Sequence, residues 1–366
     1  MLIAGGGPAG LAAAIALRQR GADVLVADAL RPPIDKPCGE GLMPASRREL
    51  ARLGIAPGVH DGVEFRGILF AEDGTQVAAD FPCGLGLGVR RTVLHRLLAD
   101  RAAELGVRLL WNTPVALAPG RPAILAGEPC AYRWLIGADG HASRVRSWAG
   151  LDARCDRFRR FGFRAHFDVA PWSEFVEIHW TGHGQIYITP VGPREVCVAA
   201  LTAAPNLRLA HLLAGCPTLR DRLAAAATTD TERGALTLTR SLRRVTSGNV
   251  ALLGDASGSA DSITGEGLAV GFRQALLLAD SLAAGTLDLY ASRHAAILAL
   301  PQRMASLMLL LDRFPRLRAR VLPVLAARPH LFRELLAVHV GEQPLPRFVL
   351  RHGAELGAML LAPGLA

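Results

Sequence analysis

A glycine-rich turn near the start of the chain constrains the fold more than any other feature. Residues 5–10 read GGGPAG; they follow a short apolar segment, 1–4, and lead into a segment rich in alanine and leucine, 10–20. When such a turn joins a strand to a helix, its first glycine permits the tight bend and its second lets the backbone approach a pyrophosphate. The third lets the helix pack closely on the strand, and N–H groups at the helix N-terminus bind the phosphates without a lysine. We therefore predict a dinucleotide-binding turn made by Gly5, Gly7, Pro8, Ala9 and Gly10.

A carboxylate stands where the second strand of this unit should end. Residues 23–27 are predicted to form that strand, and Asp28 follows it. A carboxylate about 20 residues beyond the turn is the usual hydrogen-bond acceptor for the adenosine ribose. Because a glycine triplet alone often serves only helix packing, the position of Asp28 strengthens the prediction considerably.

A third motif, far along the chain, indicates that the dinucleotide carries a flavin. An apolar strand over 250–253 runs into Gly254 and Asp255, and a loop then leads to a helix starting near Gly265. Asp255 at a strand end is suited to bind ribityl hydroxyls. The N–H groups of Gly265, Gly267 and Leu268 would face the pyrimidine edge of the flavin, where negative charge gathers on reduction. A competing interpretation, in which Thr264 merely caps this helix, leaves Asp255 unexplained.

Composition narrows the class of partner. The 366 residues carry a net charge of +9, yet Lys36 is the only lysine and the arginines are spread along the chain, which argues against nucleic acid. Mean hydropathy is high at +0.26, but no uninterrupted apolar run reaches the roughly 18 residues of a membrane span, so we expect peripheral membrane contact at most. Six cysteines without a C-x-x-C pair, and no histidine at ligand spacing, predict reduced thiols, a cytoplasmic location and no metal site.

The order of patterns predicts an α/β fold with a discontinuous nucleotide-binding domain. Alternating apolar residues between 161 and 201 indicate an antiparallel sheet, and helical periodicity follows over 207–226. We predict a Rossmann-like FAD-binding domain in two parts, 1–158 and 246–290, a smaller antiparallel substrate domain with a helix at 159–245, and a helical C-terminal region at 291–366.

The motifs, together with Gly137-Ala138-Asp139-Gly140, resemble those of the flavoprotein superfamily of aromatic hydroxylases, geranylgeranyl reductases and flavin-dependent halogenases. The resemblance implies a glutathione-reductase-like FAD fold. It also implies that Arg91 contacts the cofactor, that the backbone at Val115 meets the adenine, and that Asp139 serves the cofactor and, in hydroxylases, often the nicotinamide donor.

The chain departs in part from each subfamily. Pro37-Cys38-Gly39 is similar to a segment of geranylgeranyl reductases, whose aromatic stretch is here reduced to Tyr187-Ile188-Thr189-Pro190. Hydroxylases usually have histidine and proline after the Gly-Asp pair, where this chain has Ala256-Ser257. Halogenases need a catalytic lysine and a W-x-W-x-I-P motif, and this motif does not occur in the sequence.

We predict an FAD-dependent oxidoreductase, foremost an NAD(P)H- and O₂-dependent hydroxylase of a hydrophobic aromatic or polyketide substrate. The alternative is a reductase of C=C bonds in a prenyl or polyketide chain, with Cys38 or Glu40 supplying or guiding the proton; Cys38 as a small packing residue is equally compatible. A third possibility is a non-catalytic FAD-binding protein. The histidines His95, His166, His179 and His183 are expected to be surface or structural residues.

Overall fold

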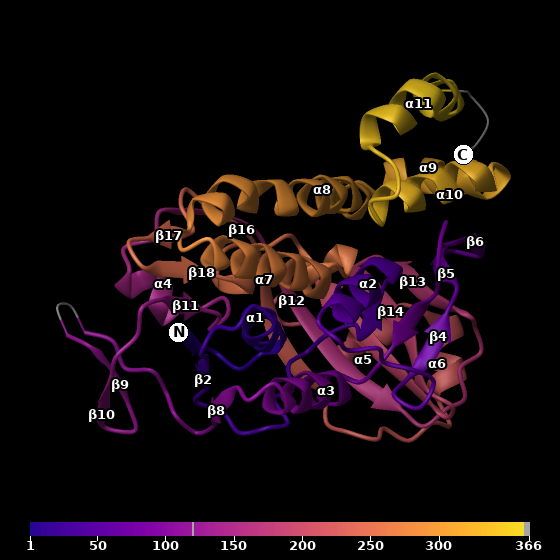
Figure 1. The fold of residues 1–366 in the computed structure, drawn as a ribbon. Coiled ribbons are helices and arrows are strands. Elements are labelled where there is room, and N and C mark those ends of the chain that lie inside the picture. The colour runs from indigo at the N-terminus through magenta and orange to yellow at the C-terminus, as the bar shows by residue number, and fades with distance from the viewer. Residues whose placement is uncertain (119–120, 362–366) are drawn as a thin grey trace.

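The computed structural model describes residues 1–118 and 121–361 (Figure 1). Its first sheet has six strands in the order β17-β18-β11-β1-β2-β8. All neighbours are parallel except the edge pair β17–β18, which confirms the predicted α/β class. The strands are β1 (Leu2–Ala4), β2 (Leu25–Ala27), β8 (Arg108–Leu110), β11 (Leu135–Gly137), β17 (Thr246–Ser247) and β18 (Val250–Leu252).

Helices cover this sheet because their apolar faces have no other place to be buried. α1 (Pro8–Arg18) is buried over nearly its whole length and packs against α7 (Gly267–Ala283) and α3 (Arg91–Glu104). α2 (Pro44–Arg52) lies beside α7, and β18 ends one residue before the end of its predicted segment. α1 and α7 thus lie side by side although most of the sequence separates them.

The second sheet has seven strands in the order β16-β12-β15-β14-β13-β5-β6. It is antiparallel except for β5 and β13, which run parallel with Gly67 opposite Phe175. The sheet therefore takes two strands from residues 67–80 in addition to those expected from 159–245, so it is not the smaller of the two by strand count. Its strands are β5 (Gly67–Glu72), β6 (Thr75–Asp80), β12 (Arg154–Phe167), β13 (Phe175–Thr181), β14 (Gly184–Gly192), β15 (Glu195–Thr202) and β16 (Arg233–Leu242).

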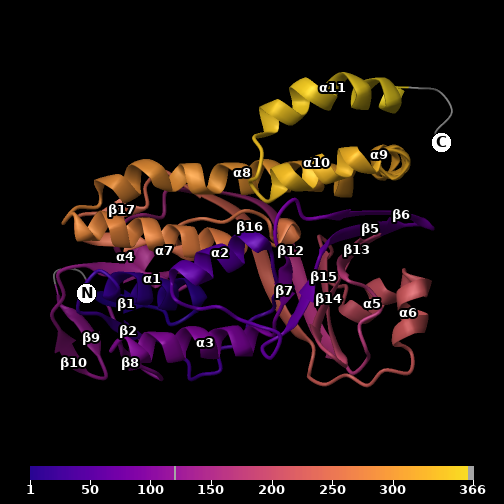
Figure 2. The same cartoon turned by 45° about the vertical axis from the view of Figure 1, so that its right-hand side comes forward.

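Two short helices cover one face of the seven-stranded sheet (Figure 2). The helical segment expected over 207–226 is divided into α5 (Leu209–Ala214) and α6 (Pro217–Leu223). Pro217 lacks a backbone N–H, so it fits the first turn of a helix but not the interior of one. The smaller pieces are a three-stranded sheet of β3 (Gly41–Leu42), β7 (Gly86–Gly88) and β4 (Val63–Phe65), the hairpin β9 (Ala123–Leu125) and β10 (Glu128–Cys130), and helix α4 (Arg144–Trp148).

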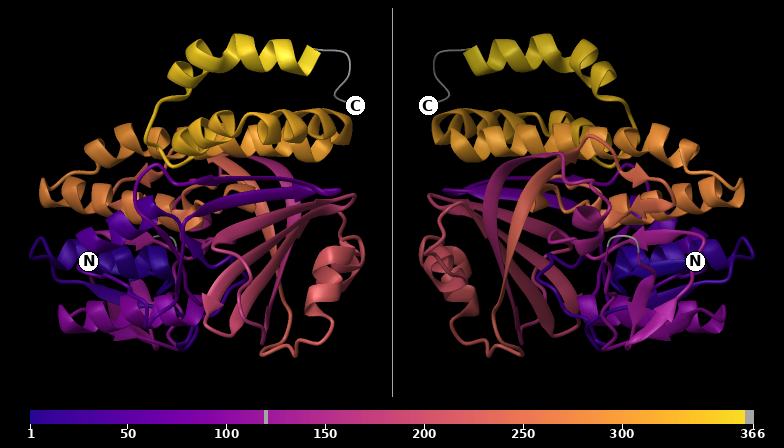
Figure 3. Two further views of the ribbon diagram at one scale, coloured as in Figure 1. Left: turned by 90° about the vertical axis from the view of Figure 1, so that its right-hand side faces the viewer. Right: turned by 90° about the vertical axis from the view of Figure 1, so that its left-hand side faces the viewer.

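The C-terminal region is helical, as predicted. It comprises α8 (Asp288–Arg313), α9 (Pro315–Ala327), α10 (Pro329–His339) and α11 (Leu345–Leu361). Figure 3 shows α9 and α10 above the edge of the seven-stranded sheet, with α11 as a separate arm over them. Within the described residues, α8 is the one helix long and apolar enough to cross a membrane, with a mean hydropathy of 1.4. It packs along α7, and 33% of its apolar window is buried. A single helix of this kind is weak evidence for a membrane span.

Candidate active site

The predicted cofactor residues follow four neighbouring strands of the parallel sheet. Gly5 follows β1, Asp28 follows β2, Asp139 follows β11 and Asp255 follows β18. Since parallel strands all point their carboxyl ends to the same edge, the fold brings these residues together from across the sequence. Ligands of open α/β sheets bind at this edge.

Two glycines of the turn are required by its backbone conformation and close packing, and a third leaves free space for a ligand. Gly5 has a φ of +112°, and a Cβ at Gly10 would lie 1.9 Å from the Gly5 carbonyl oxygen, so both are needed for the turn itself. A Cβ at Gly7 would meet no atom within 4 Å. Gly7 therefore leaves free space at the N-terminus of α1, beside its unpaired N–H groups.

Asp28 stabilises the glycine turn by accepting hydrogen bonds from the backbone. One carboxylate oxygen accepts the Gly6 N–H at 2.6 Å, and the other accepts the Leu30 N–H at 2.8 Å. Each carboxylate oxygen has a second lone pair, so these contacts leave acceptor capacity for a ribose. Val115 lies in the loop after β8, packed against an apolar cluster that includes Leu25.

Asp139 also combines a structural contact with a free oxygen. Its Oδ2 accepts the N–H groups of Arg144 and Val145 at 2.7 and 3.1 Å and so caps α4. Its Oδ1 is buried and has no partner among the described residues, and the same holds for Nε of Arg91 at the start of α3. Both side chains line one large cavity, so each carries an unpaired polar atom beside the space where a ligand would bind.

The third motif opens onto the same cavity from the other side. Gly265 has a φ of +68° and ends a short 3₁₀ turn, and α7 begins at Gly267, two residues later than predicted. A Cβ at either glycine would meet no atom within 4 Å, and Leu268 lines the cavity beside them. Thr264 donates its hydroxyl hydrogen bond to the Asp261 carbonyl and does not cap α7, so the competing capping interpretation is wrong.

The residues present fit an FAD molecule. Two helix N-termini, of α1 and α7, face one cavity through glycines that leave room for a ligand. Asp255 is half-exposed at its mouth, with its carboxylate 3.5 Å from His141. Helix N-termini favour negative charge, which suits both a pyrophosphate and a reduced flavin.

The cavity continues well beyond the cofactor residues. Its volume is about 1410 Å³, whereas ligand pockets are commonly about 300–1,000 Å³, so a second molecule has room beside a cofactor. One wall is the seven-stranded sheet, through side chains such as Ile178 and Tyr187. The far wall is made by the C-terminal helices and is almost wholly apolar: Met304, Leu307, Met308, Leu311, Val321, Leu325, Phe332, Leu335, Leu336 and Phe348.

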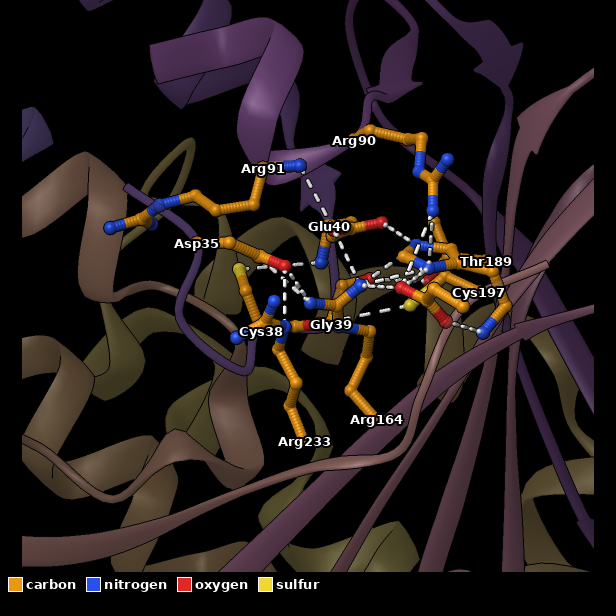
Figure 4. Close-up of polar contacts among 12 residues, drawn as sticks. Asp35, Cys38, Gly39, Glu40, Arg90, Arg91, Arg164, Thr189, Cys197 and Arg233 are labelled. Carbon is orange, nitrogen blue, oxygen red and sulfur yellow. Dashed lines mark hydrogen bonds and ion pairs between the residues drawn. The ribbon is translucent and has the colours of Figure 1, made fainter. Parts of the chain in front are cut away.

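The loop that carries Cys38 and Glu40 forms part of the cavity wall and is held against the sheet (Figure 4). Glu40 is buried with a φ of +59°, a left-handed conformation that costs about 1–2 kcal/mol in a residue with a side chain. Its Oε1 accepts the Arg91 N–H at 2.9 Å, and its Oε2 lies 2.6 Å from Nε2 of His166. Both oxygens of Glu40 are thus engaged, so we assign it a positioning role in place of the acid–base role considered from the sequence.

Behind this loop lies a cluster of compensating charges. His166 contacts Glu40 through Nε2 and Asp230 through Nδ1, the latter at 2.8 Å. Burial opposes the charged ring, but the hydrogen bonds that the ring donates to Glu40 and Asp230 outweigh it and raise the pKa of His166. Arg164 binds Asp35 at 2.7 Å and Asp230 at 2.8 Å. The cluster contains the cations Arg90, Arg164, His166 and Arg233 and the anions Asp35, Glu40, Glu195 and Asp230.

Part of this cluster has the geometry of a metal site. Ligand atoms of Glu40, His166 and Cys197 lie within 4.8 Å of one another. The guanidinium groups of Arg90 and Arg164 stand beside the same imidazole at 2.9 and 2.8 Å. Two fixed cations at this distance oppose a metal ion, so we interpret the group as an ion-pair network.

Cys38 keeps its proton in this setting. Burial raises the pKa of its thiol, Arg91 opposes the rise, and the sulfur accepts the Glu40 N–H at 3.3 Å. The Gly39 carbonyl accepts the Thr189 hydroxyl at 2.7 Å, which ties the loop to β14. The structure therefore presents a protonated thiol to the cavity, on a loop fixed from both sides.

Two histidines proved more important than expected from the sequence. His95 is fully buried, with Nε2 2.9 Å from the Gly6 carbonyl, and so supports the glycine turn. His166 is the centre of the charge cluster. The spacing of both histidines in the sequence could have indicated these positions. His95 lies four residues after Arg91, on the same face of one helix, and His166 lies two residues after Arg164, on the same face of one strand.

Comparison with known proteins agrees with the geometry. The family described as FAD binding domain matches residues 1–288. The chain belongs to this family. The predicted FAD-dependent oxidoreductase and its resemblance to the flavoprotein superfamily are thereby confirmed.

Individual relatives include both reductases and a monooxygenase. The chain is 28% identical over 357 residues to menaquinone reductase of Mycobacterium tuberculosis, covering 86% of this chain and 84% of the relative. It is 24% identical over 296 residues to digeranylgeranylglycerophospholipid reductase of Methanocella arvoryzae, covering 73% of each. It is 32% identical over 170 residues to 6-methylpretetramide 4-monooxygenase of Streptomyces rimosus, covering 41% of this chain and 30% of the relative. In fold it is similar to a flavoprotein/dehydrogenase from Cytophaga hutchinsonii, with a TM-score of 0.81, 19% identity, and 98% and 97% of the two chains covered.

Proposed function

We propose that this protein uses FAD to reduce carbon–carbon double bonds in a long, hydrophobic prenyl-type chain. The observation that carries the proposal is the continuity of the cavity from the N-terminus of α7 and the Cys38 loop to the apolar far wall. Such a wall suits a hydrocarbon chain and offers few partners to a small polar phenol. The two reductases match 86% and 73% of the chain, whereas the monooxygenase matches 41%, so the relatives favour reduction as well.

Reduction of a double bond adds a hydride to one carbon and a proton to the other. Bound in its reduced form, FAD supplies the hydride. Cys38 holds a proton at Sγ, because burial raises the pKa of its thiol, and regains it from water after transfer. The α7 N-terminus stabilises negative charge beside the cavity, and the charge cluster fixes the loop that positions the thiol.

The remaining parts of the proposal concern partners. We propose NAD(P)H as a transient electron donor and a cytoplasmic location with peripheral membrane contact, through which an oily substrate would enter. Support comes from large apolar side chains that α8, α11 and their neighbourhood leave exposed: Leu307, Leu310, Phe314, Val349 and Leu350. Co-sedimentation with phospholipid vesicles tests the contact, and protein that stays in the supernatant at low ionic strength contradicts it.

A second candidate is hydroxylation of a hydrophobic aromatic by NAD(P)H and O₂. The similarity to the Streptomyces rimosus monooxygenase favours it, and the same apolar cavity would exclude water from the reaction. From the sequence alone this reaction is the first expectation; we rank it second because the match to the monooxygenase covers a smaller part of the chain.

The deciding experiment gives the FAD-loaded protein a geranylgeranylated phospholipid, menaquinone and a panel of hydrophobic phenols. Dithionite serves as reductant without oxygen, and NAD(P)H with oxygen. A prenyl chain heavier by two hydrogens, formed without oxygen and only when the enzyme is present, supports reduction of a double bond; a product heavier by one oxygen, formed only in air, supports hydroxylation. Admitting oxygen to the chemically reduced protein in a stopped-flow spectrometer separates them independently, since a long-lived oxygen adduct is expected only of the hydroxylase. Tight FAD binding without turnover of any substrate contradicts both.

A further inference from the structure

A cysteine, a histidine and a glutamate meet on the face of the seven-stranded sheet that points away from the cavity. Sγ of Cys216 lies 3.9 Å from Nδ1 of His179, and Nε2 of His179 lies 2.7 Å from an oxygen of Glu177. The other oxygen of Glu177 accepts the Trp172 indole N–H at 3.0 Å. The glutamate orients the imidazole, and the imidazole faces the sulfur, which is the arrangement that activates a nucleophilic cysteine.

The local fold explains how the three residues come together. Val176 and Ile178 of β13 line the cavity, so Glu177 and His179, which alternate with them, point to the opposite face. Cys216 stands in the turn between α5 and α6, where Pro217 starts the second helix over this face. His179 and Glu177 are buried at 7% and 5% exposure, whereas Cys216 remains partly exposed. A reagent from solvent therefore meets the sulfur first.

The charges around the group favour a thiolate. Burial opposes charge on both partners, but the hydrogen bonds to Cys216 and Glu177 raise the pKa of His179 to about 9. The hydrogen bond with His179 likewise outweighs burial and lowers the pKa of Cys216, against the opposing charge of Glu177. From α6, Arg222 stacks 5.2 Å from the Trp172 ring and adds positive charge, while Arg220 and Asp221 compensate each other at 2.8 Å.

We propose that Cys216 is a reactive thiolate site, paired with protonated His179, that exchanges with low-molecular-weight disulfides. The Cys216 sulfur attacks one sulfur of the disulfide, forming a protein–S–S bond as the original S–S bond breaks. The electron pair of the broken S–S bond stays on the departing sulfur, and the resulting thiolate takes a proton from solvent. Cys216 is thereby oxidised to the disulfide level as the departing sulfur is reduced to a thiol. The site is separate from the cavity and does not depend on the proposed function.

Competitive alkylation of the FAD-loaded protein tests the proposal. Limiting iodoacetamide is added at about pH 7, where an ordinary thiol with a pKa of about 8.5 is mostly protonated, and each cysteine peptide is quantified by mass spectrometry. Cys83 is the internal control, because it is exposed and its pKa is raised by a hydrogen bond with Glu342. We expect Cys216 to react on the order of tenfold faster than Cys83, and to form a mixed disulfide with oxidised glutathione first.

The variant His179→Asn separates activation from simple exposure. It keeps the size and polarity of the side chain but removes the titrating ring, so the Cys216 rate should fall about tenfold at about pH 7 and recover at high pH. Glu177→Gln should have a smaller effect in the same direction. Equal rates for Cys216 and Cys83 in the unmodified protein, or an unchanged Cys216 rate in a folded His179→Asn variant, would overturn the proposal.

Discussion

The two faces of the seven-stranded sheet each place a cysteine near a buried histidine, with opposite results for the thiol. On the cavity face, Cys197 lies opposite His166 on the neighbouring strand, and both ring nitrogens of His166 face the carboxylates of Glu40 and Asp230. Burial raises the pKa of the Cys197 thiol well above its usual value, so this thiol keeps its proton. On the other face, His179 has only Glu177 on one side, and its second nitrogen faces Cys216. The two thiols thus differ in how deeply they are buried and in whether a ring nitrogen of the neighbouring histidine is hydrogen-bonded to the sulfur.

The stability of the cavity face depends on its buried ion pairs, and we expect Arg164→Met to lower the free energy of unfolding more than any other substitution proposed below. The substitution leaves Asp35, Glu40 and Asp230 with too little positive charge, and removing one partner of a buried ion pair costs about 3–5 kcal/mol. Urea unfolding measures the loss. Arg66→Met on the same sheet is the control, since its pair with Asp80 is half-exposed and should contribute less than about 1 kcal/mol. Similar losses of stability for both variants would contradict the conclusion that the buried ion pairs of Arg164 stabilise the fold more than an exposed pair does.

Exchanging the cysteines tests which face acts on the substrate. Cys38→Ala should lower turnover by about 100-fold, the usual contribution of a positioned proton donor, while FAD stays bound. Cys216→Ala, on the opposite face, should leave turnover within about twofold. Steady-state rates and the flavin absorption of both variants decide the point, and unchanged turnover of Cys38→Ala would leave that residue a packing role.

The pH dependence of stability tests the charge of His179 on the sheet face that points away from the cavity. A histidine whose pKa rises on folding stabilises the protein below its unfolded pKa of about 6.5, and this stability is lost as pH rises through the folded value. His179→Asn should therefore cost on the order of 2 kcal/mol at about pH 6 and much less above about pH 9. Unfolding curves at several pH values provide the measurement. A cost that does not change with pH would mean that the ring only packs.

The smallest expected effect is the loss of FAD affinity in Gly7→Ala, which tests whether the pyrophosphate binds at the glycine turn. Gly7→Ala adds a methyl group where the protein itself has no atom within 4 Å, so folding should be unaffected while FAD affinity falls about tenfold. In Gly10→Ala the same methyl group would lie 1.9 Å from the Gly5 carbonyl oxygen, so the turn itself must distort. Isothermal titration of the apoprotein with FAD compares the two. Full FAD affinity in Gly7→Ala would place the pyrophosphate elsewhere.

The backbone-determined part of the site could be predicted from the sequence, and the side-chain part could not. Gly5, Gly10 and Gly265 are required by local conformation, which a sequence records directly as a missing side chain. The charge cluster joins Asp35 to Arg164 and Glu40 to His166, across more than a hundred residues and two sheets. The periodicity of residues within a single helix or strand does not indicate such a long-range pairing.

The same distinction holds for the fold. β1, α1, β2 and β18 follow from strand–turn–helix patterns, so their positions can be predicted closely from the sequence. β5 and β6 pair with β13 through a contact between distant parts of the chain, and their sequence gives no sign of which sheet they join. The domain boundaries drawn from the order of sequence patterns remain a prediction.

The pairing of β5 with β13 has a consequence for synthesis of the protein. Gly67–Glu72 leaves the ribosome long before Phe175–Thr181, so one edge of β5 has no strand to pair with during this interval. β1 likewise waits for β11, and β11 for β18. A nascent chain of this kind exposes open strand edges and apolar surface until its last third has emerged, and is expected to need chaperone protection until then.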